Sequence, residues 1–210
     1  MATLDVLTLD EGKQALNATR TTASDIELAA WITAVSQRLD ELVGPVVARL
    51  VVGEVHDGGR HVVLLTHYPV RSITSVAEYV NGTEIPLTAE TRTSKPGKAF
   101  MVDQYEPDRS LSSNWLRRRS SGADARFAPG RSAVVVSYEA GRFANTASVD
   151  PRFKIAAMLM LKNLWRSQED SVATIGEFDV PASSFPTFAV PRAVREMFPR
   201  EIQEPRMGIA

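Results

Sequence analysis

Side chains that could bind a metal ion or act as a nucleophile or base are few in this sequence. The chain of 210 residues has no Cys and three His. His56 and His61 flank a predicted turn, with Asp57 and His67 close in sequence. A zinc or nickel site needs three or four ligands in a fixed geometry, and this spacing supplies no certain third ligand. We therefore predict no metal site and no cofactor.

Motifs that carry catalysis are also missing from the sequence. Gly97-Lys98 lacks the first Gly and the Ser or Thr of a phosphate-binding loop, and neither Gly-x-Ser-x-Gly nor His-Glu-x-x-His occurs. The carboxylate pairs Asp40-Glu41 and Glu169-Asp170 are adjacent residues on predicted helices. Adjacent side chains on a helix do not face each other, so neither pair suits acid-base chemistry. We predict that the protein is not an enzyme.

Charge is nearly balanced over the chain but unevenly distributed along it. The 24 Lys and Arg against 25 Asp and Glu give a net charge of -1, so no overall field attracts nucleic acid. Residues 1–45 hold seven acidic and three basic residues, a net of -4, whereas residues 108–131 hold six Arg and two Asp, a net of +4. Arg117, Arg118 and Arg119 are candidates to contact phosphates or an acidic protein surface, and the alternative is a solvated loop.

Composition excludes a disordered or membrane-spanning chain. The 44% hydrophobic and 23% charged residues are typical of a folded protein. The longest apolar run, residues 155–161, is far shorter than the roughly 20 residues of a membrane span. The first residues lack the basic and apolar regions of a signal peptide. We expect no membrane partner and synthesis in a cytoplasm.

Helices are predicted at both ends of the chain. Thr8-Leu9-Asp10-Glu11 has the form of a capping box and predicts a short helix to about Leu16. Ser24-Asp25-Ile26-Glu27 repeats this pattern and begins a longer helix, which Gly44-Pro45 ends. Asp150-Pro151 begins a third helix, apolar on nearly all sides from 153 to 165, which we expect to be the central buried helix.

Strands are predicted between these helices. Runs at 46–56 and 61–66 are expected to form one hairpin, joined by Asp57-Gly58-Gly59-Arg60. Runs at 69–80 and 83–87 are expected to form another, because Asn81-Gly82 is a strong turn pattern. We interpret most of 88–130 as a long loop, and residues 132–138 predict a further strand.

The order of these elements predicts an α+β fold, a helical bundle with a large antiparallel β insertion and an extended C-terminal arm. The predicted bundle core is 1–45 with 148–170, and the β-rich insertion with its long basic loop is 46–147. Residues 171–210 are predicted to form the arm, a short helix from Pro191 to about Met197, and a tail. The Phe residues of this Pro-rich segment either pack on their own bundle or dock on another subunit.

Six blocks of the sequence resemble one protein family. In chain order they are 7–16 (LTLDEGKQAL), 38–44 (RLDELVG), 65–76 (LTHYPVRSITSV), 134–141 (VVVSYEAG), 150–166 (DPRFKIAAMLMLKNLWR) and 190–197 (VPRAVREM). The chain thereby resembles the head-tail connector, or adaptor, proteins of long-tailed bacteriophages. The loop at 88–130 and the arm at 171–190 are longer than in the smallest members.

This resemblance implies a structural part of a virion, assembled in the host cytoplasm and located at the head-tail junction. It implies a ring of copies, twelve-fold by analogy, that binds the portal protein and extends the DNA channel. A downstream head-completion or tail protein would bind the ring, and genomic DNA would pass through it without sequence-specific binding. Neighbouring copies could join through the acidic N-terminal residues and the basic 108–131 stretch.

The closing residues are the candidate partner interface. We predict that the chain from about Phe185 onward engages the portal, through Phe185, Phe188, Arg192, Arg195 and Phe198. Two alternatives remain open at this point. One is a non-specific nucleic-acid-binding protein that uses Arg117, Arg118 and Arg119, and the other is another head-closure or tail-completion ring protein. A hydrolase with an unrecognised site is a third class.

Overall fold

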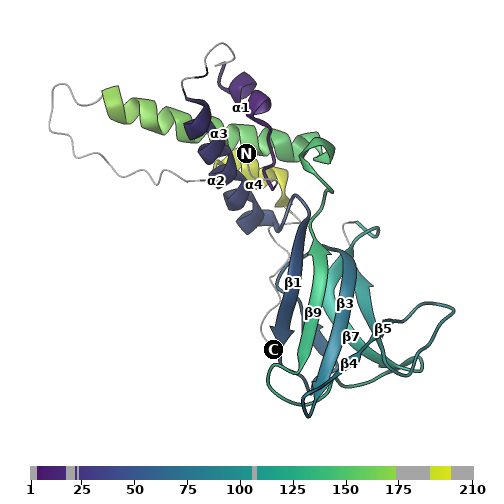
Figure 1. The fold of residues 1–210 in the computed structure, drawn as a ribbon. Coiled ribbons are helices and arrows are strands. Elements are labelled where there is room, and N and C mark those ends of the chain that lie inside the picture. The colour runs from purple at the N-terminus through teal and green to yellow at the C-terminus, as the bar shows by residue number, and fades with distance from the viewer. Residues whose placement is uncertain (1–3, 18–21, 23, 106–107, 174–189, 200–210) are drawn as a thin grey trace. The chain divides into compact units, whose positions relative to one another are not determined.

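The computed structural model describes residues 4–17, 22, 24–105, 108–173 and 190–199, with the side chains of 167–173 left out. The described residues divide into two compact units (Figure 1). The helical unit contains the described residues up to Val47 and from Phe143 onward, and the sheet unit is Ala48–Arg142. Within the described residues no helix is both long and apolar enough to cross a membrane. The mixed content of a large sheet and four α-helices agrees with the predicted α+β class.

The helical unit contains α1 (Leu9–Ala15), α2 (Asp25–Val43), α3 (Pro151–Ala173) and α4 (Arg192–Met197), with a short 3-10 helix at Thr146–Ser148. The capping box of α1 is confirmed, since Glu11 N donates to Thr8 Oγ1 at 3.2 Å and Thr8 N donates to Glu11 Oε2 at 2.8 Å.

The prediction of a capping box at the start of α2 is wrong, because the Ser24 side chain makes no capping hydrogen bond. Its backbone (φ -110°, ψ 16°) is not in the extended conformation that aims a capping hydroxyl at the helix. The adjacent Asp25 pairs with Lys13 at 2.6 Å and so ties α2 to α1.

One face of α3 forms the centre of the helical core. Its buried residues and those of α2 belong to one apolar cluster: Phe153, Ala156, Ala157, Met160 and Leu161 with Leu28, Ile32, Val35 and Leu39. Ile155 is 50% exposed, so the prediction of a helix buried nearly all round is corrected to one buried face. The opposite face of α3 is exposed to solvent, because the other described elements of the helical unit pack against α3 on one side only.

Among the described residues of the sheet unit, nine strands form one sheet. They are β1 (Arg49–His56), β2 (Val62–Leu64), β3 (Val70–Val80), β4 (Thr83–Pro86), β5 (Thr88–Ala89), β6 (Ala99–Gln104), β7 (Ser112–Ser120), β8 (Ala123–Asp124) and β9 (Val134–Ala140). The order is β1-β9-β3-β7-β6-β5, with β4 beside β3 and both β2 and β8 beside β7 (Figure 1). Every pair is antiparallel except β5 with β6. The apolar core of this unit includes Leu65, Leu116, Phe127, Val136 and Tyr138.

One of the two predicted hairpins is confirmed. The β3–β4 hairpin turns at Asn81-Gly82, with φ of 50° and 78° in the left-handed region that this turn requires. The prediction of a hairpin over residues 46–66 is wrong, because β1 pairs with β9 and β2 pairs with β7. The loop between β1 and β2 bonds elsewhere instead: Gly58 N donates to Gly130 O at 2.9 Å. A Cβ on Gly58 would lie 1.7 Å from the Ala128 carbonyl oxygen, so only glycine permits this approach.

The predicted long loop at 88–130 is also wrong, since it contains β5 to β8. Strand β7 alternates its buried positions, but one of them is an arginine, Arg118, next to buried Leu116. A charged residue at an inward position hides the period-two pattern by which strands are predicted. Of the predicted arm at 171–190, residues 171–173 belong to α3, and all others except Val190 lie outside the described residues.

Candidate functional site

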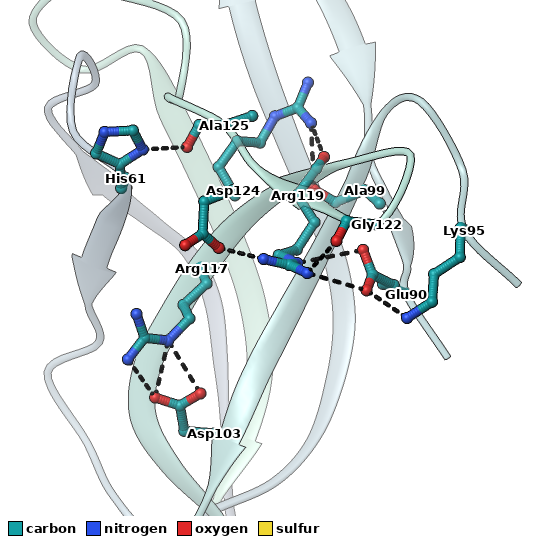
Figure 2. A network of polar contacts seen from close by, with 11 residues as sticks. His61, Glu90, Lys95, Ala99, Asp103, Arg117, Arg119, Gly122, Asp124 and Ala125 are labelled. Carbon is teal, nitrogen blue, oxygen red and sulfur yellow. Dashed lines mark hydrogen bonds and ion pairs between the residues drawn. The ribbon is translucent and has the colours of Figure 1, made fainter. Parts of the chain in front are cut away.

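The three consecutive arginines lie on β7, where successive side chains point to opposite faces of the sheet. Arg117 Nε and Nη2 donate to the carboxylate of Asp103 on β6 at 2.9–3.0 Å (Figure 2). Arg119 lies two residues further along the same face. Its Nε is 3.3 Å from Glu90 Oε2, and its Nη1 pairs with Asp124. Lys95 Nζ lies 2.7 Å from Glu90 Oε1 (Figure 2). Hydrogen bonds from Lys95 and Arg119 hold the pKa of Glu90 below its ordinary value.

Arg118 points to the opposite face and is buried. Its Nε donates to Glu78 Oε1 on β3 at 2.9 Å, and the two residues are 8% and 4% exposed. The Glu78 carboxylate also accepts a hydrogen bond from Ala128 N at 3.1 Å. This pair therefore joins β7, β3 and the loop before β9.

The arginine cluster carries no surplus charge. Its four cations, Arg117, Arg118, Arg119 and Lys95, are matched by four carboxylates: Asp103, Glu78, Glu90 and Asp124. Within the predicted basic loop, Arg117, Arg118 and Arg119 therefore belong to an ion-paired strand, β7. Contact with nucleic acid or an acidic surface through these arginines stays a prediction, and the pairing weighs against it because phosphate binding uses unneutralised cations.

A second polar cluster surrounds Glu54 at the C-terminal half of β1. Glu54 Oε1 accepts from Thr66 N at 2.8 Å and Oε2 accepts from the Tyr138 hydroxyl at 2.6 Å. His56 Nε2 lies 2.7 Å from Oε1. Burial raises the pKa of Glu54, but the contacts with His56, Tyr138 and Thr66 outweigh it and lower the pKa to about 2. Burial and the hydrogen bond to Glu54 raise the pKa of Tyr138.

The three histidines do not converge. His56 faces Glu54, whereas His61 Nδ1 lies 2.9 Å from the Ala125 carbonyl (Figure 2), and His67 donates its backbone N–H to Tyr138. Within the described part of the chain, no group of three or more His, Asp or Glu residues could hold a metal ion. A shallow surface hollow beside β2 is lined by His56, Asp57, Arg60 and Val62 to Leu64.

Exposed apolar side chains mark a different surface, which the sequence analysis missed. Leu50, Val52 and Val55 on β1 are 66%, 74% and 52% exposed. A bulge between Val51 and Glu54, with Gly53 at φ +66°, turns Glu54 inward and Val55 outward. Because residues 50–52 are apolar at three successive positions, this part of β1 resembles a strand buried on both sides.

The predicted partner residues near the C-terminus differ in their surroundings. Phe198 is fully buried in the helical core, with its ring centroid 4.7 Å from that of Phe153. Its predicted place in a partner surface is therefore corrected. Arg192 and Arg195 are exposed on α4, and Arg192 pairs with Glu196 at 2.7 Å. Phe185 and Phe188 lie outside the described residues.

Comparison with known proteins identifies related folds and no related sequence. No protein-family model matches the chain, and no curated protein is significantly similar to it. A chain in the neck of an empty gene transfer agent (GTA) particle, computed with C6 symmetry, is similar with a TM-score of 0.56 and 15% identity over 96% of this chain and 92% of that chain. A chain in the virion of a native GTA particle is similar with a TM-score of 0.50 and 18% identity over 84% of each chain. At these identities the likeness establishes a shared fold.

Proposed function

We propose that this protein is a structural component of the neck of a phage-like particle, joining head to tail as a head-tail connector. The observation that carries this proposal is the fold likeness to a GTA neck chain, which extends over 96% of this chain and therefore includes both units. The family resemblance of six sequence blocks is independent of that comparison and leads to the same class of protein.

The polar clusters support a role without catalysis. In the described residues each carboxylate of the arginine cluster is paired with a cation of the same chain. Glu54 is surrounded by hydrogen-bond donors of its own unit. A general base needs a reachable proton on a substrate, and closed clusters of this kind stabilise a fold instead.

The proposed assembly is a ring of copies of this chain, with twelve-fold symmetry by analogy with the connector family. Its partners are the portal protein above it, a head-completion or tail protein below it, and genomic DNA that passes through without sequence-specific binding. The C6 symmetry used for the neck neighbour is compatible with six copies or a multiple of six. Its location is the virion neck, after assembly in the host cytoplasm.

The portal contact is proposed to involve Phe185, Phe188, Arg192 and Arg195. Deletion of residues 186–210 cannot separate loss of the portal contact from loss of stability, because it removes the buried Val194 and Phe198 from the helical core. The exposed arginines of α4 can be changed without such a loss.

Electron microscopy of the purified protein mixed with the portal protein of the same particle tests the proposal. We expect an additional ring on the portal, and Arg192→Glu with Arg195→Glu is expected to reduce its occupancy. Arg92→Glu with Arg131→Glu, a reversal of two exposed arginines in the sheet unit, is the matched control. If the wild-type chain adds no ring to the portal, the connector proposal is wrong. If the ring forms equally well with the double variant, α4 is not the portal contact.

A further inference from the structure

The exposed sides of α2 and α3 carry charges of opposite sign. Both helices bury their other side in one apolar cluster of the helical unit. From residue 151 to residue 166, α3 has four basic residues and no acidic residue. By contrast, α2 has four acidic residues and one basic residue, Arg38. A helix surface that only faces water is typically laced with charges of both signs, so these two surfaces differ from an ordinary solvated face.

The exposed residues of α3 up to position 166 lie on one side of the helix, which is its outer face. At about 100° per residue they fall within about 120° of one another: Pro151, Arg152, Ile155, Lys162, Asn163 and Arg166. The guanidinium of Arg152 lies 4.9 Å from the Phe198 ring centroid, so this cation belongs to the contact with α4. Lys162 and Arg166 have no ion-pair partner among the described residues. Because they are four residues apart, their like charges repel each other, and an acidic partner would relieve this repulsion.

The exposed residues of α2 also lie on one side, the outer face of that helix. They fall within about 100° of one another: Ile26, Glu27, Ala30, Gln37 and Glu41. Both charged members are acidic. Glu41 pairs with Arg38 of the same helix at 2.5 Å, and an exposed pair of this kind contributes little stability, so the carboxylate can exchange it for another cation. Between the two glutamates lie the small side chains of Ala30 and Ala34, which let another helix approach closely.

Each outer face also exposes one large apolar side chain. In the described helical unit the exposed large hydrophobic residues are Ile26 on α2 and Ile155 on α3, at 91% and 50%. A single exposed apolar residue is ordinary by itself. Here each one lies on a face whose charges have one sign, and that sign is positive on α3 and negative on α2. The two faces therefore complement each other in charge and each supplies an apolar contact.

We propose that the outer face of α3 in one copy of this chain binds the outer face of α2 in the next copy, and that this helix contact links neighbours in the ring. A second copy is the occupant because the charge that would neutralise each face is present on the other face of the same molecule. The two faces are different surfaces, so the contact is heterologous and can repeat from copy to copy, as a ring requires. The inference rests on the proposed function, which supplies the ring.

Reversal of charge on one face at a time tests the contact. The α3 variant is Lys162→Glu with Arg166→Glu, and the α2 variant is Glu27→Lys with Glu41→Lys. Each variant then has two outer faces of the same sign, so we expect at least tenfold less ring formation than wild type, measured by mass photometry with the portal protein present. All four positions are exposed, and the melting temperature of each monomer is expected to stay unchanged. Arg92→Glu with Arg131→Glu, in the sheet unit, is the matched control and should form rings normally.

A mixture of the two variants gives the sharpest readout. In this mixture the acidic α3 of the first variant meets the basic α2 of the second, and the other two faces are those of wild type. Every contact between unlike variants then joins opposite charges, whereas every contact between like variants is repulsive. We expect the mixture to form rings in which the variants alternate, at half or more of the wild-type yield. Mixing would not repair a folding defect or the loss of a contact elsewhere on the chain.

Three outcomes would overturn the helix contact. One is normal ring formation by either variant alone, and another is a mixture that stays unassembled. The third is an α3 variant that forms rings but no longer binds the portal, since the basic face would then belong to the portal contact.

The helix contact and the connector function fail in different ways. Rings of a single variant on the portal would refute the helix contact and leave the connector function standing. Rings that are lost in each variant, return on mixing and do not bind the portal would support the helix contact and refute the connector function. A wild-type chain that forms no oligomer with or without portal would refute both.

Discussion

At the scale of single residues, Glu54 links three segments of the sheet unit. It lies on β1, accepts a hydrogen bond from Tyr138 of β9, and accepts two more from Thr66 in the turn after β2. A carboxylate held by several donors is stabilised in its charged form, as its lowered pKa indicates. The stability of this unit should therefore depend on the ionisation of one side chain.

Acid should weaken the fold through Glu54. Its pKa is lowered from 4.5 to about 2, so its contribution is complete above pH 4.5 and is lost as the pH falls toward 2. We expect Glu54→Gln to lower the free energy of unfolding at pH 7 by on the order of 1–2 kcal/mol, after allowance for solvent screening. The difference from wild type should disappear toward pH 2.

Urea unfolding followed by circular dichroism at pH 7 and at lower pH measures this dependence. Glu139→Gln is the control, because that carboxylate is 41% exposed and lies 3.5 Å from Arg71. An equal difference between Glu54→Gln and wild type at every pH would contradict the assignment.

Arg118 is expected to contribute more to stability than its two neighbours. Replacing it leaves the carboxylate of Glu78, 4% exposed, without its cation in the sheet. Arg118→Met should destabilise the protein by about 3–5 kcal/mol, whereas Arg117→Met should cost less than about 1 kcal/mol because the Asp103 pair is partly exposed. The double variant Arg118→Met, Glu78→Leu should recover most of the loss. Chemical denaturation measures all three, and equal effects of the two single changes would contradict the buried-pair interpretation.

At the scale of elements, α4 is part of the helical core although it follows a long stretch outside the described residues. Val194 and Phe198 are fully buried, and the Phe198 ring packs on Phe153 of α3. The guanidinium of Arg152 lies 4.9 Å from the Phe198 ring centroid, so this aromatic contact also holds a cation. A six-residue helix is stable here because of this packing and not by itself.

Phe198→Ala should therefore destabilise the helical unit, by about 3–5 kcal/mol, because it removes a buried aromatic side chain. Arg195→Ala, an exposed change on the same helix, should have an effect within about 0.5 kcal/mol. Thermal unfolding followed by circular dichroism at 222 nm compares the two variants. A small effect of Phe198→Ala would place this residue outside the core and restore it as a partner contact.

At the scale of the whole molecule, the described residues of the sheet unit come from one stretch of the chain, Ala48–Arg142. Each unit has its own apolar cluster, one that includes Leu161 and one that includes Leu116. We expect residues 48–142 to fold when expressed alone, with a β-type circular dichroism spectrum and one cooperative thermal transition. Broad, non-cooperative melting would show instead that the sheet unit depends on the helical unit.

Nucleic-acid binding by the free chain should be weak. The arginine cluster is neutralised by its own carboxylates, and the whole chain has a net charge of -1. In a gel-shift experiment at 150 mM salt we expect no retarded band with short duplex DNA at micromolar protein. A band that is lost in the variant Arg117→Ser, Arg119→Ser would favour the nucleic-acid-binding alternative.

Local patterns were sufficient for several elements. The capping box at Thr8, the end of α2 at Gly44 and the Asn81-Gly82 turn each depend on residues within a few positions of one another. Their geometry follows from backbone preferences and short-range hydrogen bonds, which the order of residues alone determines. The start of α3 at Pro151 was predicted for the same reason.

Tertiary structure decided the pairing of strands and the state of the charges. β1 pairs with β9, about eighty residues away, and not with its neighbour β2, because long-range pairing is selected by the burial of whole sheet faces. Arg118 is a buried strand residue only because Glu78, forty positions earlier, neutralises it. The sequence by itself therefore determined the capping box of α1, the end of α2 at Gly44, the Asn81-Gly82 turn and the absence of cysteine chemistry. Only the folded chain decided that the arginines are paired and that β1 is an exposed edge, since both depend on distant residues meeting in space.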